Sequence, residues 1–146
     1  MENNEILHLI RSVEMLTNEA VVKWTKMFDH NIGISPILVL QELKAESPQK
    51  QTVLAETLAY TPGAITNISG KLVKLGYAER IYNDEDRRQI LLGITEKGLS
   101  FLDEVQEKGD QLRMELFREL NDEEIKQYLA INEKLLQALR KTTFTP

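Results

Sequence analysis

The segment from Thr61 to Lys74 (TPGAITNISGKLVK) carries short polar and basic side chains at helical spacing. With its apolar residues turned inward, the outward positions are Thr61, Gly63, Thr66, Asn67, Gly70, Lys71 and Lys74. Threonine can bond a base or a phosphate, asparagine can hold adenine through two hydrogen bonds, and lysine can neutralise phosphate. We interpret the segment as a helix that reads the major groove of DNA. A solvated helix face would also explain the lysines, but explains the two glycines poorly, because glycine costs about 1 kcal/mol in a helix relative to alanine.

A second polar segment, DEDRR at 84–88, has two arginines directly after three acidic residues. We predict that Asp86 orients Arg88 so that this arginine enters a narrow minor groove, where the potential is most negative. Arg87 adds a second positively charged side chain next to Arg88. Asp84 and Glu85 are better explained as an exposed turn whose charges neutralise one another, and the alternating ligands and glycine of a calcium loop are missing.

Residue patterns for catalysis are missing from the sequence. It has no G-x-G-x-x-G, P-loop, H-E-x-x-H or G-x-S-x-G motif, and it has no cysteine. His8 and His30 have no carboxylate at metal-ligand spacing. We therefore predict a protein that is not an enzyme, with no metal and no cofactor.

Length and composition predict one globular domain. The chain has 146 residues, 42% hydrophobic and 28% charged, with a net charge of −5. No apolar run approaches the roughly 20 residues of a spanning helix, and the acidic N-terminus is not a signal peptide. We expect a cytoplasmic protein without a membrane partner. The segment 50–88 carries +1 while the remainder is acidic, so the middle of the chain is the place to expect a polyanion.

The elements that must position these side chains follow from hydrophobic periodicity and capping residues. A first helix is expected at 5–30, ended by Asn31-Ile32-Gly33, and a second begins at Ser35-Pro36 as cap and first helical residue. Further helices are expected at 51–59, 62–75, 96–119 and 122–141, and strands at 77–83 and 89–95. The fold class is mainly α with a small β-hairpin wing. Residues 34–95 form a winged helix-turn-helix, flanked by long helices in 1–33 and 96–146.

Both flanking regions have broad apolar faces. In the last helix Ile125, Leu129, Leu135 and Leu139 make one stripe. Burying a leucine is worth roughly 1.5–3 kcal/mol, so we predict a homodimer that buries these faces and sets two reading helices about one DNA turn apart. The alternative is a bundle within one chain.

The stretch from Gly63 resembles the MarR-type (multiple antibiotic resistance) transcriptional regulators. The matching features are Ala64-Ile65-Thr66, Leu72…Leu75-Gly76-Tyr77, Glu79-Arg80, Asp86-x-Arg88 and Leu92…Thr95-x-Lys97-Gly98. The resemblance implies a homodimer with intertwined terminal helices, in which Thr61, Thr66 and Asn67 read the major groove and Arg88, oriented by Asp86, the minor groove. Two positions depart from the family: Asn67 replaces a common arginine, and Gly70 stands where a charged residue is common. With no cysteine, peroxide sensing through a thiol is excluded.

The resulting hypothesis is a sequence-specific double-stranded DNA-binding transcriptional regulator, expected to be a repressor of a pseudo-palindromic operator. The resemblance also implies tuning by a small, often phenolic, effector. Trp24, Met27, Phe28 and His30 are candidates for its pocket by position, with packing in the core or interface as the alternative. The competing function is a winged-helix protein-interaction module without specific DNA binding.

Overall fold

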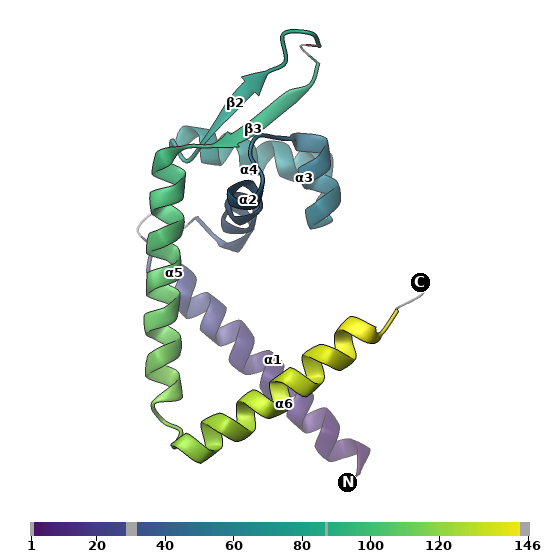
Figure 1. Cartoon of the computed structure of the whole chain (residues 1–146), viewed down its shortest axis with the longest axis vertical. Helices are drawn as coiled ribbons and strands as arrows, with labels where there is room; N and C mark the ends of the chain where they lie inside the picture. Colours follow the sequence, from purple (N-terminus) through teal and green to yellow (C-terminus); the bar gives the residue numbers. More distant parts are fainter. Residues whose placement is uncertain (1, 29–31, 87, 144–146) are drawn as a thin grey trace. The chain divides into compact units, whose positions relative to one another are not determined.

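The computed structural model describes residues 2–28, 32–86 and 88–143. Within them the fold is mainly helical with one small sheet, as predicted, and Figure 1 shows the order of its elements. The bounds are α1 Asn3–Thr25, α2 Ile34–Ala45, β1 Gln49–Lys50, α3 Gln51–Leu58, α4 Pro62–Lys74, β2 Ala78–Tyr82, β3 Ile90–Ile94, α5 Glu96–Phe117 and α6 Asp122–Lys141. The chain divides into two compact units, 1–109 and 110–146, so that α5 contributes to both.

The hydrophobic core of the first unit lies among α2, α3, α4 and the sheet. Its fully buried side chains include Leu40, Leu43, Leu54, Leu72 and Leu92. Close packing of these side chains holds α3 and α4 at a fixed angle, as a helix-turn-helix requires. Ala55 is buried too, and its small side chain lets α3 and α4 pack closely.

The break between α3 and α4 is made by two neighbouring residues. Ala59 adopts the left-handed conformation, with φ of 55°, and ends α3. Thr61 then caps α4, because its Oγ1 accepts a hydrogen bond from the Ala64 amide at 3.1 Å. Pro62 occupies the first turn, where its missing N–H would be unsatisfied in any residue. The predicted break between the helices at 51–59 and 62–75 is confirmed.

The sheet has three antiparallel strands in the order β1-β3-β2. The predicted hairpin is confirmed, with Ala78 opposite Ile94 and Tyr82 opposite Ile90. The short strand β1 was not predicted, because two residues are too few for an alternating pattern. It is positioned by Gln49, whose side-chain amide donates to the carbonyls of Glu42 and Glu46 at the end of α2.

Two predicted helix boundaries are wrong. The first helix ends at Thr25, and not near residue 30, because Phe28 turns into the core and the Met27 carbonyl accepts a hydrogen bond from Lys108 Nζ. The second helix begins at Ile34, with Gly33 as its N-cap at φ of 79°, so Ser35 lies inside the first turn. The predicted stop at Asn31 lies outside the described residues.

The end of α4 and the start of α5 are joined by a set of short contacts. Thr95 Oγ1 donates to the Gly76 carbonyl at 2.6 Å and accepts from the Gly98 amide at 3.0 Å. Lys97 Nζ donates to the Leu75 carbonyl at 2.9 Å. A side chain at Gly98 would overlap the carbonyl of Tyr77. The Thr95-x-Lys97-Gly98 motif therefore fixes the C-terminal end of α4 against α5.

The second unit contains the end of α5 and all of α6. Asn121 and Glu124 form a capping box at the start of α6, with both hydrogen bonds at 2.9 Å. The rings of Phe117 and Tyr128 meet edge to face at 5.6 Å. None of the described residues of α6 is buried. Among the described helices, none is long and apolar enough to cross a lipid bilayer.

Candidate nucleic-acid interface

Helix α4 turns one face inward and the other to solvent. Ile65, Ser69 and Leu72 are buried, at the spacing of one helix face. Thr61, Gly63, Thr66 and Asn67 are all exposed. The predicted reading positions in the first half of α4 therefore share the outward face.

The two threonines of α4 have different hydrogen-bonding capacity left for a ligand. Thr61 Oγ1 already accepts from a backbone amide, so its hydroxyl proton can be donated, for example to a phosphate oxygen. Thr66 Oγ1 donates to the Pro62 carbonyl at 2.8 Å. Its oxygen can still accept, and its methyl can pack on thymine. The side chains are thus suited to different partners.

The two lysines at the end of α4 also differ. Lys71 Nζ donates to the Ile32 carbonyl at 3.1 Å, which ties α4 to the chain just before α2. Lys71 and Asn67 also line a hollow of about 340 Å³ between the start of α2 and the middle of α4. Lys74 is exposed. The contact of Lys71 across 39 positions in sequence was not foreseen, because nothing in helical spacing indicates the partner of a lysine.

The hairpin tip brings Asp86 and Arg88 together. Asp86 Oδ1 accepts from the Arg88 backbone N–H at 3.1 Å and from Arg88 Nε at 3.3 Å. The Arg88 side chain is nevertheless 94% exposed. An exposed ion pair contributes little to stability. The Asp86 carboxylate therefore serves to orient the Arg88 side chain, through its backbone N–H and Nε. Glu85 N–H donates to Asn83 Oδ1, and Arg87 lies outside the described residues.

These parts make a helix and a hairpin that each present polar or basic groups to solvent. Figure 1 shows the β2–β3 hairpin projecting away from α2, α3 and α4. A helix of this kind fits the major groove, and an extended arginine fits the minor groove. The arrangement is that of a winged helix-turn-helix.

Comparison with known proteins decides the family. The MarR family model matches residues 34–90. The transcriptional repressor MdtR of Bacillus subtilis is 31% identical over 108 residues, which cover 73% of this chain and 70% of that protein. The chain belongs to the MarR family. It is accordingly a DNA-binding transcriptional regulator, and the named relatives are regulators rather than enzymes.

Other relatives of this MarR-family chain agree. The transcriptional regulator PapX of Escherichia coli is 27% identical over 136 residues, covering 88% of this chain and 81% of that one. The solved structure of YusO from Bacillus subtilis superposes with a TM-score of 0.80 at 25% identity, covering 94% and 99% of the two chains. The fold also matches that of a mutant of Escherichia coli MarR complexed with operator DNA, with a TM-score of 0.65 at 24% identity, over 91% and 96% of the chains.

Three of the four predicted effector residues are described, and they lie at the end of α1. Trp24 Nε1 donates to the Val105 carbonyl at 3.2 Å, and its ring meets Phe28 edge to face. Phe28 is buried against Phe101. Met27 is partly exposed, and His30 lies outside the described residues. In this MarR-family chain the rings of Trp24 and Phe28 therefore pack against each other and against α5.

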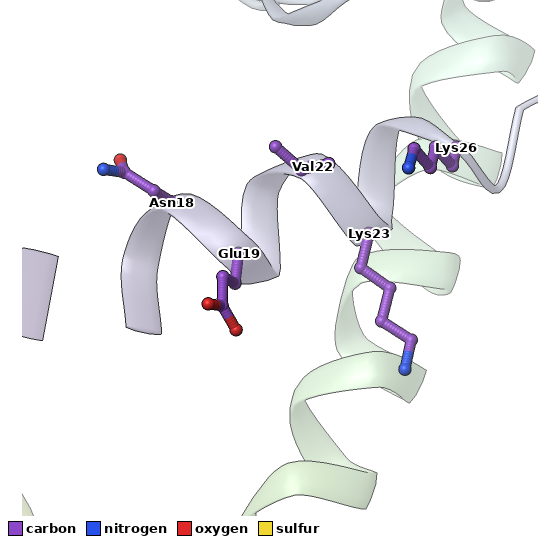
Figure 2. A pocket seen from close by; sticks show the side chains of 5 residues that line it. All are labelled: Asn18, Glu19, Val22, Lys23 and Lys26. Carbon is purple, nitrogen blue, oxygen red and sulfur yellow. The ribbon is translucent and has the colours of Figure 1, made fainter. Parts of the chain in front are cut away.

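A hollow of about 390 Å³ lies nearby on α1. Figure 2 shows its lining side chains, Asn18, Glu19, Val22, Lys23 and Lys26, all from that helix and its C-terminal end. Trp24, Met27 and Phe28 do not line it. Among the described residues, no cluster of three or more His, Asp and Glu side chains is arranged to hold a metal.

Proposed function

We propose that the chain is a repressor that binds a pseudo-palindromic operator as a homodimer. The observation that carries the proposal is the exposed outward face of α4, with Thr66 and Asn67, beside an extended Arg88 held by Asp86. In each subunit α4 enters the major groove, where Thr61, Gly63, Thr66 and Asn67 approach base edges. Arg87 and Arg88 meet the minor groove, and Lys71 and Lys74 meet phosphates. Two relatives are named as repressors, MdtR and the Escherichia coli protein MprA, and their names support repression as the direction of regulation.

The apolar faces of α1 and α6 support the homodimer. None of the described residues of either helix is buried, although both are rich in large apolar side chains. On α6, Leu129, Leu135 and Leu139 are each at least 57% exposed. Each leucine buried is worth roughly 1.5–3 kcal/mol, so a partner that covers both helices would be strongly stabilising. We assign residues 1–33 and 96–146 to this dimerisation region.

Sedimentation tests the dimer. We expect a dimer at micromolar concentration, and Leu135→Asp should shift it to monomer because the carboxylate would be buried in the interface. Gln137→Asp is the matched control on the same helix and should remain dimeric. A wild-type monomer at this concentration would contradict the proposal.

Binding to DNA is tested by fluorescence anisotropy with the DNA upstream of the gene, over a salt series. A DNA reader should weaken steeply with salt through counterion release. Arg88→Ala should cost about 1–3 kcal/mol per wing, whereas Arg113→Ala, which removes an equal charge from α5, should change little. A protein-interaction module would show no salt-sensitive specific complex.

Transcription in vitro from the same DNA, with and without the protein, tests repression.

We further propose that a small phenolic effector binds near Trp24, Met27, Phe28 and His30 and releases the DNA. Support comes from the aromatic rings gathered at the end of α1 and from the exposure of Met27. Trp24 is the chain's one tryptophan, so its fluorescence reports on this place directly. Titration with a simple hydroxybenzoate should change that fluorescence and lower operator affinity together; a change in neither would refute the effector site.

A further inference from the structure

The side chain of Arg80 on β2 lies against α4 beside Gly70, which has no side chain. It is exposed on β2, and its neighbours two residues away, Ala78 and Tyr82, share its side of the strand. A Cβ built on Gly70 of α4 would lie 3.6 Å from Arg80 Nη2. The guanidinium group therefore occupies the space beside α4 that a longer side chain at residue 70 would fill.

Residue 70 continues the outward face of α4. It follows Thr66 and Asn67 by four and three positions, and Lys74 follows it by four, so all four positions lie along one stripe. Gly70 has no side chain of its own to offer a ligand. In this chain the charge at that point of the stripe comes from β2.

The charge of Arg80 is available to a ligand. None of the ion pairs among the residues that the structure describes involves Arg80. Arg88, in contrast, is paired with Asp86. The planar guanidinium presents its N–H donors as a fork that matches two phosphate oxygens.

The geometry points to Arg80 as a further DNA-contacting residue, which binds a backbone phosphate at the edge of the major groove that α4 enters. The inference rests on the proposed function. It places a cation between the reading helix and the wing, so that one phosphate is held from the sheet and the neighbouring bases are read from the helix. Phosphate contacts of this kind set the register of a reading helix without reading sequence.

The test is the slope of log affinity against log salt for the upstream DNA. Each phosphate contact contributes about 0.9 to this slope, so Arg80→Ala should lower it by about 1.8 in a dimer with two half-sites. At roughly 0.1 M salt the same relation gives an affinity loss of about 8-fold for each subunit engaged. Arg80→Lys keeps the positive charge, so the slope should stay the same. Affinity should fall because an ammonium group cannot form the two parallel hydrogen bonds of a guanidinium group.

Two further variants test the assignment. Arg113→Ala removes an equal charge from α5 and should keep the wild-type slope. Gly70→Asp would pair with Arg80, so Arg80→Ala should have a much smaller effect in that background. Thermal unfolding of each variant separates a loss of contact from a loss of fold.

The outcomes are distinguishable. If wild type shows a steep slope and Arg80→Ala keeps it, the role of Arg80 is wrong and the proposed function stands. If wild type forms no salt-sensitive complex, both are wrong. A slope lowered in Arg80→Ala and restored in Arg80→Lys supports the phosphate contact.

Discussion

Replacing Gly98 by alanine tests whether the contacts between α4 and α5 hold the fold together. The new methyl group would overlap the Tyr77 carbonyl oxygen and lie 2.9 Å from Ile94 Cγ1. The carbonyl cannot easily move aside, because it accepts a hydrogen bond from the Thr95 amide at 3.1 Å. To make room for the methyl group α5 must shift away from Tyr77, and this shift stretches or breaks the bond.

The expected magnitude follows from three terms. Overpacking costs about 1–3 kcal/mol, and a lost backbone hydrogen bond costs about 0.5–1.5 kcal/mol. Alanine returns about 1 kcal/mol of helix propensity. Gly98→Ala should therefore lower the free energy of unfolding by about 0.5–3.5 kcal/mol, although alanine is normally the better helix former.

Two other helical glycines are matched controls. A Cβ at Gly63 would meet nothing within 4 Å, and one at Gly70 would make an ordinary contact at 3.6 Å. Both alanine variants should be unchanged or up to about 1 kcal/mol more stable. Urea unfolding followed by circular dichroism measures all three, at one protomer concentration because dimer stability depends on it. A Gly98→Ala protein as stable as the controls would refute the reasoning.

Three further predictions concern single side chains. Ser69 Oγ is buried in α4 with no hydrogen-bond partner among the described residues, so Ser69→Ala should raise the unfolding free energy by about 1–3 kcal/mol; a decrease in urea unfolding would contradict this. Burial, with a smaller contribution from the Glu104 carboxylate, raises the pKa of Tyr77 above its usual 10.0. The unfolded phenol then ionises first, so this contribution to stability is present below about pH 10 and is lost as pH rises through the folded pKa; Tyr77→Phe should show a shallower alkaline decline in melting temperature, and an identical decline would count against it. Asn121→Ala removes the cap of α6 and should cost about 1 kcal/mol, measured by the same denaturation, with the exposed Gln127→Ala as a control expected to change little.

Local sequence determined the parts of the fold that depend on local interactions. Thr61 caps α4 and Asn121 caps α6 through side-chain bonds within three residues, so both could be predicted from spacing. The buried stripe of α4 was also predicted, because helical periodicity places Ile65 and Leu72 on one face. The side-chain geometry of Asp86 and Arg88 spans only two residues and was expected for the same reason.

Contacts between distant residues could not be predicted in this way. The end of α1 depends on Lys108, which bonds a carbonyl 81 positions away in the sequence. The strand β1 exists because Lys50 and its neighbour meet β3. The positions of Lys71 against Ile32 and of Arg80 against Gly70 likewise arise from tertiary packing.

The contacts of Thr95, Lys97 and Gly98 have a mechanical consequence for the position of α4. Because the C-terminal end of α4 is bonded to the first turn of α5, a rotation there carries α4 together with the helices and the sheet that share its core. A helix of 13 residues is about 20 Å long, so each degree of rotation displaces its far tip by about 0.3 Å. About ten degrees would move Thr61 by roughly one nucleotide step of about 3.4 Å. A change of a few degrees at these contacts would therefore displace the reading helix appreciably relative to a DNA groove.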